Sequence, residues 1–150
     1  MDEIDRKIID LLQADGRISA VKLGEAVGLS PAPVTERLRK LQQAGIIQGF
    51  QARLNPVAMG CPVLAFVQVL IERPEHEAAF LAMVRATPEI LECHHVTGEW
   101  SYLLKIRAAD MAGLESLLVR CIKGLPGIPR SHTVIALSSA KDEAALPILC

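Results

Sequence analysis

The fold is decided by residues 28–44, whose sequence is GLSPAPVTERLRKLQQA. Gly28 can adopt a positive φ and make a tight turn. Ser30 is a residue type favoured at a helix N-cap, where its hydroxyl accepts a hydrogen bond from the first turn. Pro31 then occupies the first helical position, where its missing N–H costs nothing, and Gly45 follows as the C′ residue. The stretch therefore predicts a short, sharply started helix behind a glycine turn.

This helix is amphipathic, because Val34, Leu38 and Leu41 fall on one face at helical spacing. An ordinary surface helix of any globular protein would share that property. The preceding residues are therefore needed to distinguish such a helix from the DNA-reading helix of a helix-turn-helix. Residues 20–27, with Ser19 as N-cap, predict a second short helix, and a turn this short makes the two helices cross steeply. The pair is typical of a helix-turn-helix, in which the second helix enters the DNA major groove.

The charge of the chain is unevenly distributed along its 150 residues. The net charge is −1, but Arg17–Arg53 holds six basic and two acidic residues, a local charge of +4. This basic stretch coincides with the predicted helix-turn-helix, as contact with DNA phosphates requires. Aromatic residues make up only 3% of the chain, which argues against binding of single strands, because such binding depends on aromatic stacking.

The rest of the composition is that of a globular protein, with 51% hydrophobic and 22% charged residues. No apolar run is long enough to span a bilayer, and the acidic start Met1–Asp5 does not resemble a signal peptide. We therefore expect a cytoplasmic protein without membrane partners. The widely spaced cysteines are expected to be free and mostly buried thiols; they are Cys61, Cys93, Cys121 and Cys150.

The elements expected in the remaining chain form two groups. A first helix over residues 4–13, capped by Asp2, precedes the helix-turn-helix, and residues 45–54 are expected to form a small strand or hairpin, the wing of a winged helix. Beyond Pro62 the pattern is β-α-β-β-α-β, with strands at 63–71, 90–97, 102–107 and 131–138 and helices at 75–86 and 111–123. The predicted class is α+β: a winged helix-turn-helix domain (1–54), a linker (55–62) and a ferredoxin-like βαββαβ sandwich (63–150).

These residues resemble the Lrp/AsnC family, the feast/famine transcriptional regulators, over essentially the whole chain. The matching motifs are Ile4-Asp5-Arg6-Lys7-Ile8-Ile9, Asp15-Gly16-Arg17, Gly28-Leu29-Ser30-Pro31, Glu36-Arg37-Leu38-Arg39-Lys40-Leu41, Gly45-Ile46-Ile47 and Thr97-Gly98. The resemblance implies a DNA-binding domain joined to a RAM/ACT-like sandwich that dimerises, often builds octamers and binds small effectors, commonly amino acids.

The candidate DNA-binding residues lie on the exposed faces of the predicted recognition helix: Ser30, Ala32, Pro33, Thr35, Glu36, Arg37, Arg39 and Lys40. Thr35, Glu36 and Arg39 are expected to contact base edges, and Arg39 can pair with guanine O6 and N7. Arg37 and Lys40 are expected to meet phosphate, with an ion pair to Glu36 or Glu25 as the alternative for Arg37. Ser30, at a helix N-terminus, can also present a backbone N–H to a phosphate.

The candidate effector site is the turn of the predicted hairpin: Thr97, Gly98, Glu99, Trp100 and Ser101. Its backbone N–H groups can hold a carboxylate. Where the family usually has an aromatic residue followed by Asp, this chain has Trp100-Ser101, so Glu99 is left to pair with an ammonium. Trp100 favours an aliphatic or thioether side chain, such as that of leucine or methionine. A homodimer is also expected, because both faces of the first strand are apolar.

Enzymatic motifs such as G-x-S-x-G, a P-loop, a Rossmann fingerprint or HExxH do not occur, so neither catalysis nor a cofactor is predicted. The alternative is a siroheme-decarboxylase-like enzyme, which shares the Lrp/AsnC architecture and would use His94, His95 and Tyr102. A metal site at Cys93-His94-His95 is not predicted, because neighbouring side chains of a strand face opposite ways and structural zinc needs four ligands.

Overall fold

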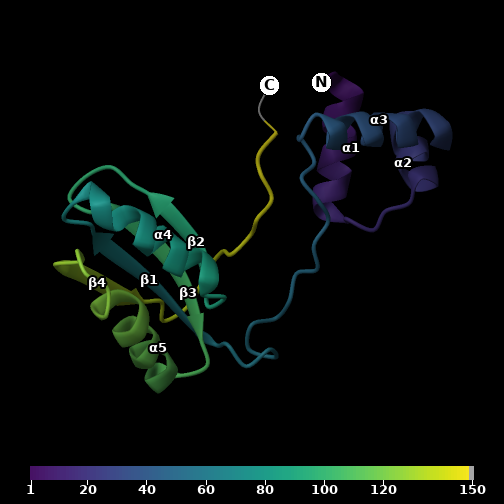
Figure 1. Ribbon diagram of the computed structural model, residues 1–150. Coiled ribbons are helices and arrows are strands. Elements are labelled where there is room, and N and C mark those ends of the chain that lie inside the picture. The colour runs from purple at the N-terminus through teal and green to yellow at the C-terminus, as the bar shows by residue number, and fades with distance from the viewer. Residues whose placement is uncertain (149–150) are drawn as a thin grey trace. The chain divides into compact units, whose positions relative to one another are not determined.

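The computed structural model describes residues 1–148 and divides them into two compact units, which are treated separately (Figure 1). The first unit comprises Met1–Arg53 together with the residues from Lys141 onward. The second unit is Leu54–Ala140. The C-terminal residues thus group with the first unit, whereas the sequence pattern assigned them to the second.

Three helices form the first unit: α1 (Glu3–Ala14), α2 (Ala20–Val27) and α3 (Pro31–Gln43). Each contributes one side chain to the centre of the core, and these three, Ile8, Leu23 and Val34, are all 0% exposed. Local capping explains where α1 and α2 begin. Asp2 accepts a hydrogen bond from the Asp5 N–H at 2.8 Å, and Ser19 accepts one from the Lys22 N–H at 3.3 Å.

The turn between α2 and α3 is held closed by a glycine that the sequence analysis did not single out. Gly28 has φ +72°, as predicted for the turn, and the Leu29 N–H donates to the Gly24 carbonyl at 2.9 Å. A Cβ atom at Gly24 would lie only 2.4 Å from the Leu29 carbonyl oxygen. A glycine at this position therefore lets the turn pack directly on α2. With α2, the short turn and α3 all in place, the predicted helix-turn-helix is confirmed.

Two expectations for this unit were wrong. Ser30 is at the N-cap of α3, but its hydroxyl makes no capping hydrogen bond. One of the two donors that a cap can use, the N–H of N3, is missing because that residue is Pro33. The second error is the wing: the described backbone between α3 and β1 contains no strand. Gly45 ends α3 at φ +71° as predicted, but the residues after it find no second strand with which to pair.

The backbone of the C-terminal segment of the first unit is held by side chains of α1 and of the residues that follow α3. The side-chain amide of Gln13 donates to the Leu146 carbonyl at 3.0 Å and accepts from the Leu146 N–H at 2.7 Å. The Arg53 guanidinium donates to the Asp142 carbonyl. One glutamine thus satisfies both backbone polar groups of a residue that lies 133 positions further along the chain.

The second unit is the predicted split βαβ fold. Its elements are β1 (Val63–Leu70), η1 (Pro74–His76), α4 (Glu77–Ala86), β2 (Ile90–His95), β3 (Tyr102–Ala108), α5 (Met111–Leu118), η2 (Val119–Lys123) and β4 (Arg130–Ile135). The strands form one antiparallel sheet in the order β2-β3-β1-β4. The two predicted helices each contain one irregular turn, because η1 is a 3₁₀ turn before α4 and η2 is a π-helical turn after α5.

Both helices cover the same face of this sheet (Figure 1). Phe80 of α4 and Leu114 of α5 share one buried cluster with Val67 of β1 and Leu104 of β3. The alternate residues of the strands lie on the opposite face, which we call the open face; its apolar members are Leu64, Phe66 and Leu70 of β1, Leu103 of β3 and Val134 of β4. Val134 remains 50% exposed.

Three of the four cysteines lie within the described residues. Cys61, Cys93 and Cys121 are free thiols, but only Cys121 is buried, so the expectation of mostly buried thiols was too broad. Cys150 lies outside the described residues. Over residues 1–148, no helix combines the length and hydrophobicity that a membrane span needs.

Candidate nucleic-acid interface and effector loop

The outer face of α3 presents Thr35, Glu36, Arg39 and Lys40, all exposed. The Thr35 hydroxyl donates to the Pro31 carbonyl one turn earlier at 2.9 Å, so this side chain already has a hydrogen bond within its own helix. Ala32 and Pro33 are also exposed in the first turn. The face therefore carries an acid flanked by two cations, beside a first turn of small and apolar side chains.

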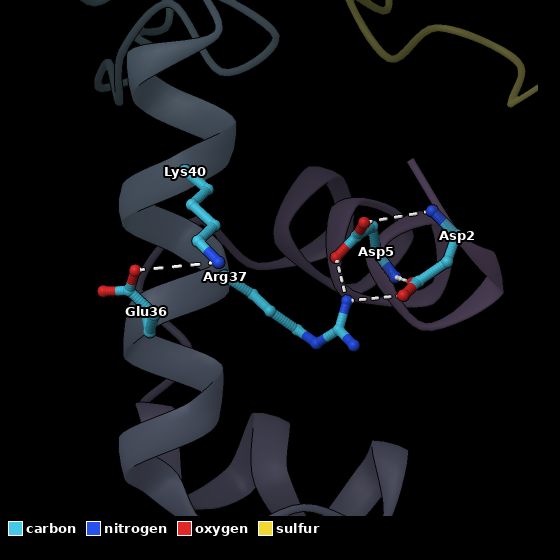
Figure 2. Close-up of polar contacts among 5 residues, drawn as sticks. All are labelled: Asp2, Asp5, Glu36, Arg37 and Lys40. Carbon is cyan, nitrogen blue, oxygen red and sulfur yellow. Dashed lines mark hydrogen bonds and ion pairs between the residues drawn. The ribbon is translucent and has the colours of Figure 1, made fainter.

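Glu36 organises the charges of this face. Arg39 donates to its carboxylate from Nε at 2.8 Å and from Nη2 at 2.6 Å. Lys40 Nζ lies 3.9 Å from the same carboxylate (Figure 2). The hydrogen bonds from Arg39 lower the pKa of Glu36 from its usual value, so the carboxylate is charged at neutral pH. The pairing uses the Nε–Nη2 edge of the Arg39 guanidinium, and the edge with Nη1 takes no part in it.

Arg37 behaves differently from the other two cations of α3. Its Nη1 donates to Asp5 Oδ1 and to Asp2 Oδ2, both at 2.7 Å, so the guanidinium lies between two carboxylates at the start of α1 (Figure 2). The predicted ion-pair partners Glu36 and Glu25 were wrong. A local charge pattern could not reveal the contact, because Asp2 and Arg37 are 35 residues apart.

The five predicted effector residues lie together in the β2–β3 hairpin. Gly98 has φ +105°, as a turn glycine requires. Two polar groups of Ser101 are already used, because its N–H donates to the Val69 carbonyl at 2.9 Å and its hydroxyl accepts from the Ile71 N–H at 3.0 Å. Thr97 is exposed at the tip. The hairpin is thus anchored at Ser101, while its tip remains open to solvent.

Trp100 and Glu99 both contact β4, which the sequence analysis did not anticipate. The Arg130 guanidinium lies 5.0 Å from the Trp100 ring centroid and also forms an ion pair with Glu99. The His132 ring stacks on Trp100 with centroids 6.3 Å apart. Arg130 and His132 occupy open-face positions of β4, since they pair with Leu70 and Gln68 of β1. The indole is therefore held beside the open face, where a cation covers it.

Only two of the three residues expected for the alternative enzyme come together, because the His95 ring stacks on Tyr102 with centroids 5.0 Å apart, whereas His94 lies on the other face of the sheet. His94 pairs with Leu103 on the open face, whereas His95 pairs with Tyr102 on the helix-covered face. The Tyr102 hydroxyl donates to Glu77 Oε1 at 2.5 Å, and this hydrogen bond, with burial, raises the pKa of Tyr102 to about 12. Within residues 1–148, no three His, Cys, Asp or Glu side chains gather in a way that could hold a metal ion. This arrangement does not favour the decarboxylase-like interpretation.

Comparison with protein families assigns both units. Residues 1–42 match the AsnC-type helix-turn-helix domain, and residues 64–146 match the Lrp/AsnC ligand binding domain. The chain belongs to the Lrp/AsnC family. The two matches follow the order in which the structure places the helix-turn-helix and the βαββαβ sheet, so this Lrp/AsnC protein is a transcriptional regulator with a DNA-binding and a ligand-binding domain.

Relatives of this Lrp/AsnC chain match it over nearly its whole length. The leucine-responsive regulatory protein of Salmonella typhimurium is 42% identical, over 99% of this chain and 92% of its own, and that of Escherichia coli K12 is 41% identical over the same shares. Among solved structures, the Neisseria meningitidis regulator NMB0573 in complex with L-Met is 34% identical with a TM-score of 0.94, covering 98% of this chain and 96% of its own. E. coli AsnC is 26% identical with a TM-score of 0.90, covering 98% and 99%.

Proposed function

We propose that this Lrp/AsnC regulator recognises a specific duplex DNA sequence through the outer face of α3. The observation that carries the proposal is the tight α2–α3 turn, which leaves Thr35, Glu36, Arg39 and Lys40 exposed on one helix. A helix-turn-helix places these positions of its second helix against base edges and phosphates. We assign DNA binding to residues 1–54, joined by residues 55–62 to the effector and assembly domain that begins at residue 63.

The charges of α3 suggest a division of roles. Arg39 keeps one guanidinium edge outside its pairing with Glu36, and this edge suits bidentate contact with guanine O6 and N7. Lys40, 69% exposed, suits a phosphate. Ser30, with Ala32 and Pro33 beside it, brings the first turn close to the DNA backbone, where the helix N-terminus favours an anion. Thr35 can add a base contact by turning its hydroxyl away from Pro31.

Binding measurements on a duplex selected from a random pool test these roles. Arg39→Ala should weaken binding to the selected duplex by about tenfold or more and relax discrimination at one base pair. Lys40→Ala should weaken binding to all sequences alike and lower the salt dependence by about one phosphate contact. If Arg39→Ala discriminates among bases as the wild type does, Arg39 does not read the sequence.

We further propose that an amino acid binds between protomers at Thr97, Gly98, Glu99, Trp100 and Ser101 and modulates DNA binding. The support is the exposed hairpin tip beside an indole that lies on the open face, together with the L-Met in the complex of the similar Neisseria regulator. Because Glu99 is paired with Arg130, a ligand ammonium must replace the guanidinium there, and Arg130 is then released to meet the ligand carboxylate. Leucine and methionine fit the apolar surface of Trp100.

Trp100 is the only tryptophan of the chain, so its fluorescence reports directly on this loop. Titration with each of the twenty amino acids should change that fluorescence for leucine or methionine and leave it unchanged for aspartate. Gly98→Asp, which adds a side chain where φ is +105°, should abolish the response. A parallel calorimetric screen in which no amino acid binds at millimolar concentration would exclude the effector site.

The open face supports a homodimer. Val134 is 50% exposed on this face and Phe66, Leu70 and Leu103 are partly exposed, whereas Leu64 is already buried. Exposed apolar side chains gathered on one sheet face are a liability in a monomer, and a second copy would cover them. A two-fold dimer would also present two recognition helices to half-sites one helical turn apart. Assembly of dimers into an octamer follows from the family resemblance alone. Sedimentation of the purified protein at micromolar concentration tests the dimer, because it measures the mass of the assembly. We infer no catalytic role.

A further inference from the structure

Arg37 is the least exposed cation of α3. Its side chain is 29% exposed, against 53% for Arg39 and 69% for Lys40. Instead of projecting from the outer face, it reaches across to the start of α1, as Figure 2 shows. A cation that contacts DNA phosphates has no need of two carboxylate partners from another helix. The Arg37 side chain therefore connects α3 to the start of α1.

The two partners of Arg37 are themselves held in place by the N-terminal cap of α1. Asp2 accepts from the Asp5 N–H at 2.8 Å, and Asp5 accepts from the Asp2 N–H at 3.0 Å. The Asp5 side chain is only 14% exposed. Because each carboxylate is oriented by a backbone N–H, the Arg37 guanidinium meets a preformed pair of acceptors, which reduces the entropy lost on pairing.

The geometry also fixes where this contact acts along α3. Arg37 lies between Val34 and Leu41, the two residues of α3 that are buried in the core, at 0% and 4% exposure. These apolar contacts hold the helix against the unit, but apolar packing is non-directional. The hydrogen bonds from Arg37 add direction, because they fix the rotation of α3 about its axis relative to α1. That rotation determines which side chains face the DNA.

We propose that Arg37 is a positioning residue, which orients the recognition helix through the Asp2–Asp5 cap of α1 and does not itself bind DNA. The inference rests on the proposed role of α3. It replaces the phosphate contact expected from the sequence and has an unusual consequence. Removal of a negative charge from a DNA-binding protein normally strengthens binding, because the repulsion from phosphate falls. Removal of the Asp5 charge should instead weaken it, since α3 loses its orientation.

The test compares five single variants and the double variant Asp5→Asn/Arg37→Met, all made in the full chain, on the selected duplex, with folding verified by circular dichroism. Asp5→Asn keeps an oxygen that can accept from the Asp2 N–H, so the cap of α1 is preserved while the charge is lost. Arg37→Met keeps the side-chain length without the donors. Asp10→Asn removes a matched exposed charge from the same helix, and Lys40→Met removes a cation proposed to contact phosphate.

We expect Asp5→Asn and Arg37→Met each to weaken binding about fivefold, and the double variant to be no weaker than Arg37→Met. Neither Asp5→Asn nor Arg37→Met should change the slope of log K against log salt. Lys40→Met should lower the magnitude of that slope by about 0.9. Asp10→Asn should bind as the wild type or more tightly. Unchanged or tighter binding by Asp5→Asn, or a slope lowered by about 0.9 in Arg37→Met, would overturn the inference.

The same data separate this inference from the proposed function. If the wild-type protein shows no preference for any duplex, the role of α3 fails before Arg37 is considered. If the wild type is sequence-specific and Lys40→Met behaves as expected while Asp5→Asn binds normally, only the positioning role of Arg37 fails. Arg37→Lys provides a further control: it keeps the charge, so a phosphate contact would survive it, but a single ammonium cannot reproduce the guanidinium geometry between the two carboxylates.

Discussion

The close approach at Gly24 makes Gly24→Ala the most informative single change in the first unit. In a helix interior, alanine is normally favoured over glycine by about 0.5–1 kcal/mol. Here the new methyl group would lie 2.4 Å from the backbone carbonyl oxygen of Leu29. A backbone atom cannot turn aside as a side chain can, so the turn or α2 must move. Forced overpacking of this kind costs about 1–3 kcal/mol, which outweighs the gain in helix propensity.

The assay is urea unfolding of the full chain followed by circular dichroism, with the selected duplex titrated in parallel. We expect the Gly24→Ala protein to be less stable than the wild type and to bind the duplex more weakly, because a displaced turn changes the angle at which α3 leaves α2. Gly113→Ala is the control, since its new Cβ would meet no backbone atom and only one side-chain atom, Oδ1 of Asp110, at 3.3 Å. A Gly24→Ala protein as stable as the wild type would refute the reasoning.

Three further changes probe other parts of the chain. The pKa of Asp2 is lowered by the Asp5 N–H and by Arg37. The charged Asp2 side chain therefore stabilises the fold above about pH 4, and this contribution is lost as the pH falls through the lowered pKa. In Asp2→Asn, the urea midpoint should accordingly fall less steeply between about pH 6 and pH 2 than in the wild type. Gln13→Ala removes both hydrogen bonds to Leu146, and residues 141–148 should then be cleaved faster by a nonspecific protease with helicity unchanged. Phe66→Glu places a charge on the open face, and sedimentation should show a smaller assembly than that of the wild type.

Local patterns were sufficient to predict most of the fold. Asp2 and Ser19 begin their helices, and Gly28 and Gly45 adopt positive φ, because each acts on neighbours within four residues. The strands of the second unit also follow from their own alternation and from the breaks that bound them. Propensity and capping are properties of short segments, so a single sequence carries them.

Apart from the capping hydrogen bond of Ser30, which fails for a local reason, the errors concern contacts between distant parts of the chain or the need for a partner. The expected wing has alternating residues, but a strand is stable only when another strand pairs with it, and local pattern does not supply one. The partners of Arg37, the contact of Trp100 with Arg130 and the docking of Leu146 on Gln13 all join residues thirty or more positions apart. Such contacts depend on how the elements pack, which periodicity does not specify.

The central claim, that the outer face of α3 reads a DNA sequence, is tested most directly by selection of duplexes from a random pool with the wild-type protein and with Arg39→Ala in parallel. We predict that the wild type enriches one motif with two half-sites about one helical turn apart. The Arg39→Ala protein should enrich the same motif with one symmetric pair of positions no longer specified. Failure of the wild type to enrich any motif, or recovery of an identical motif by both proteins, would contradict the account.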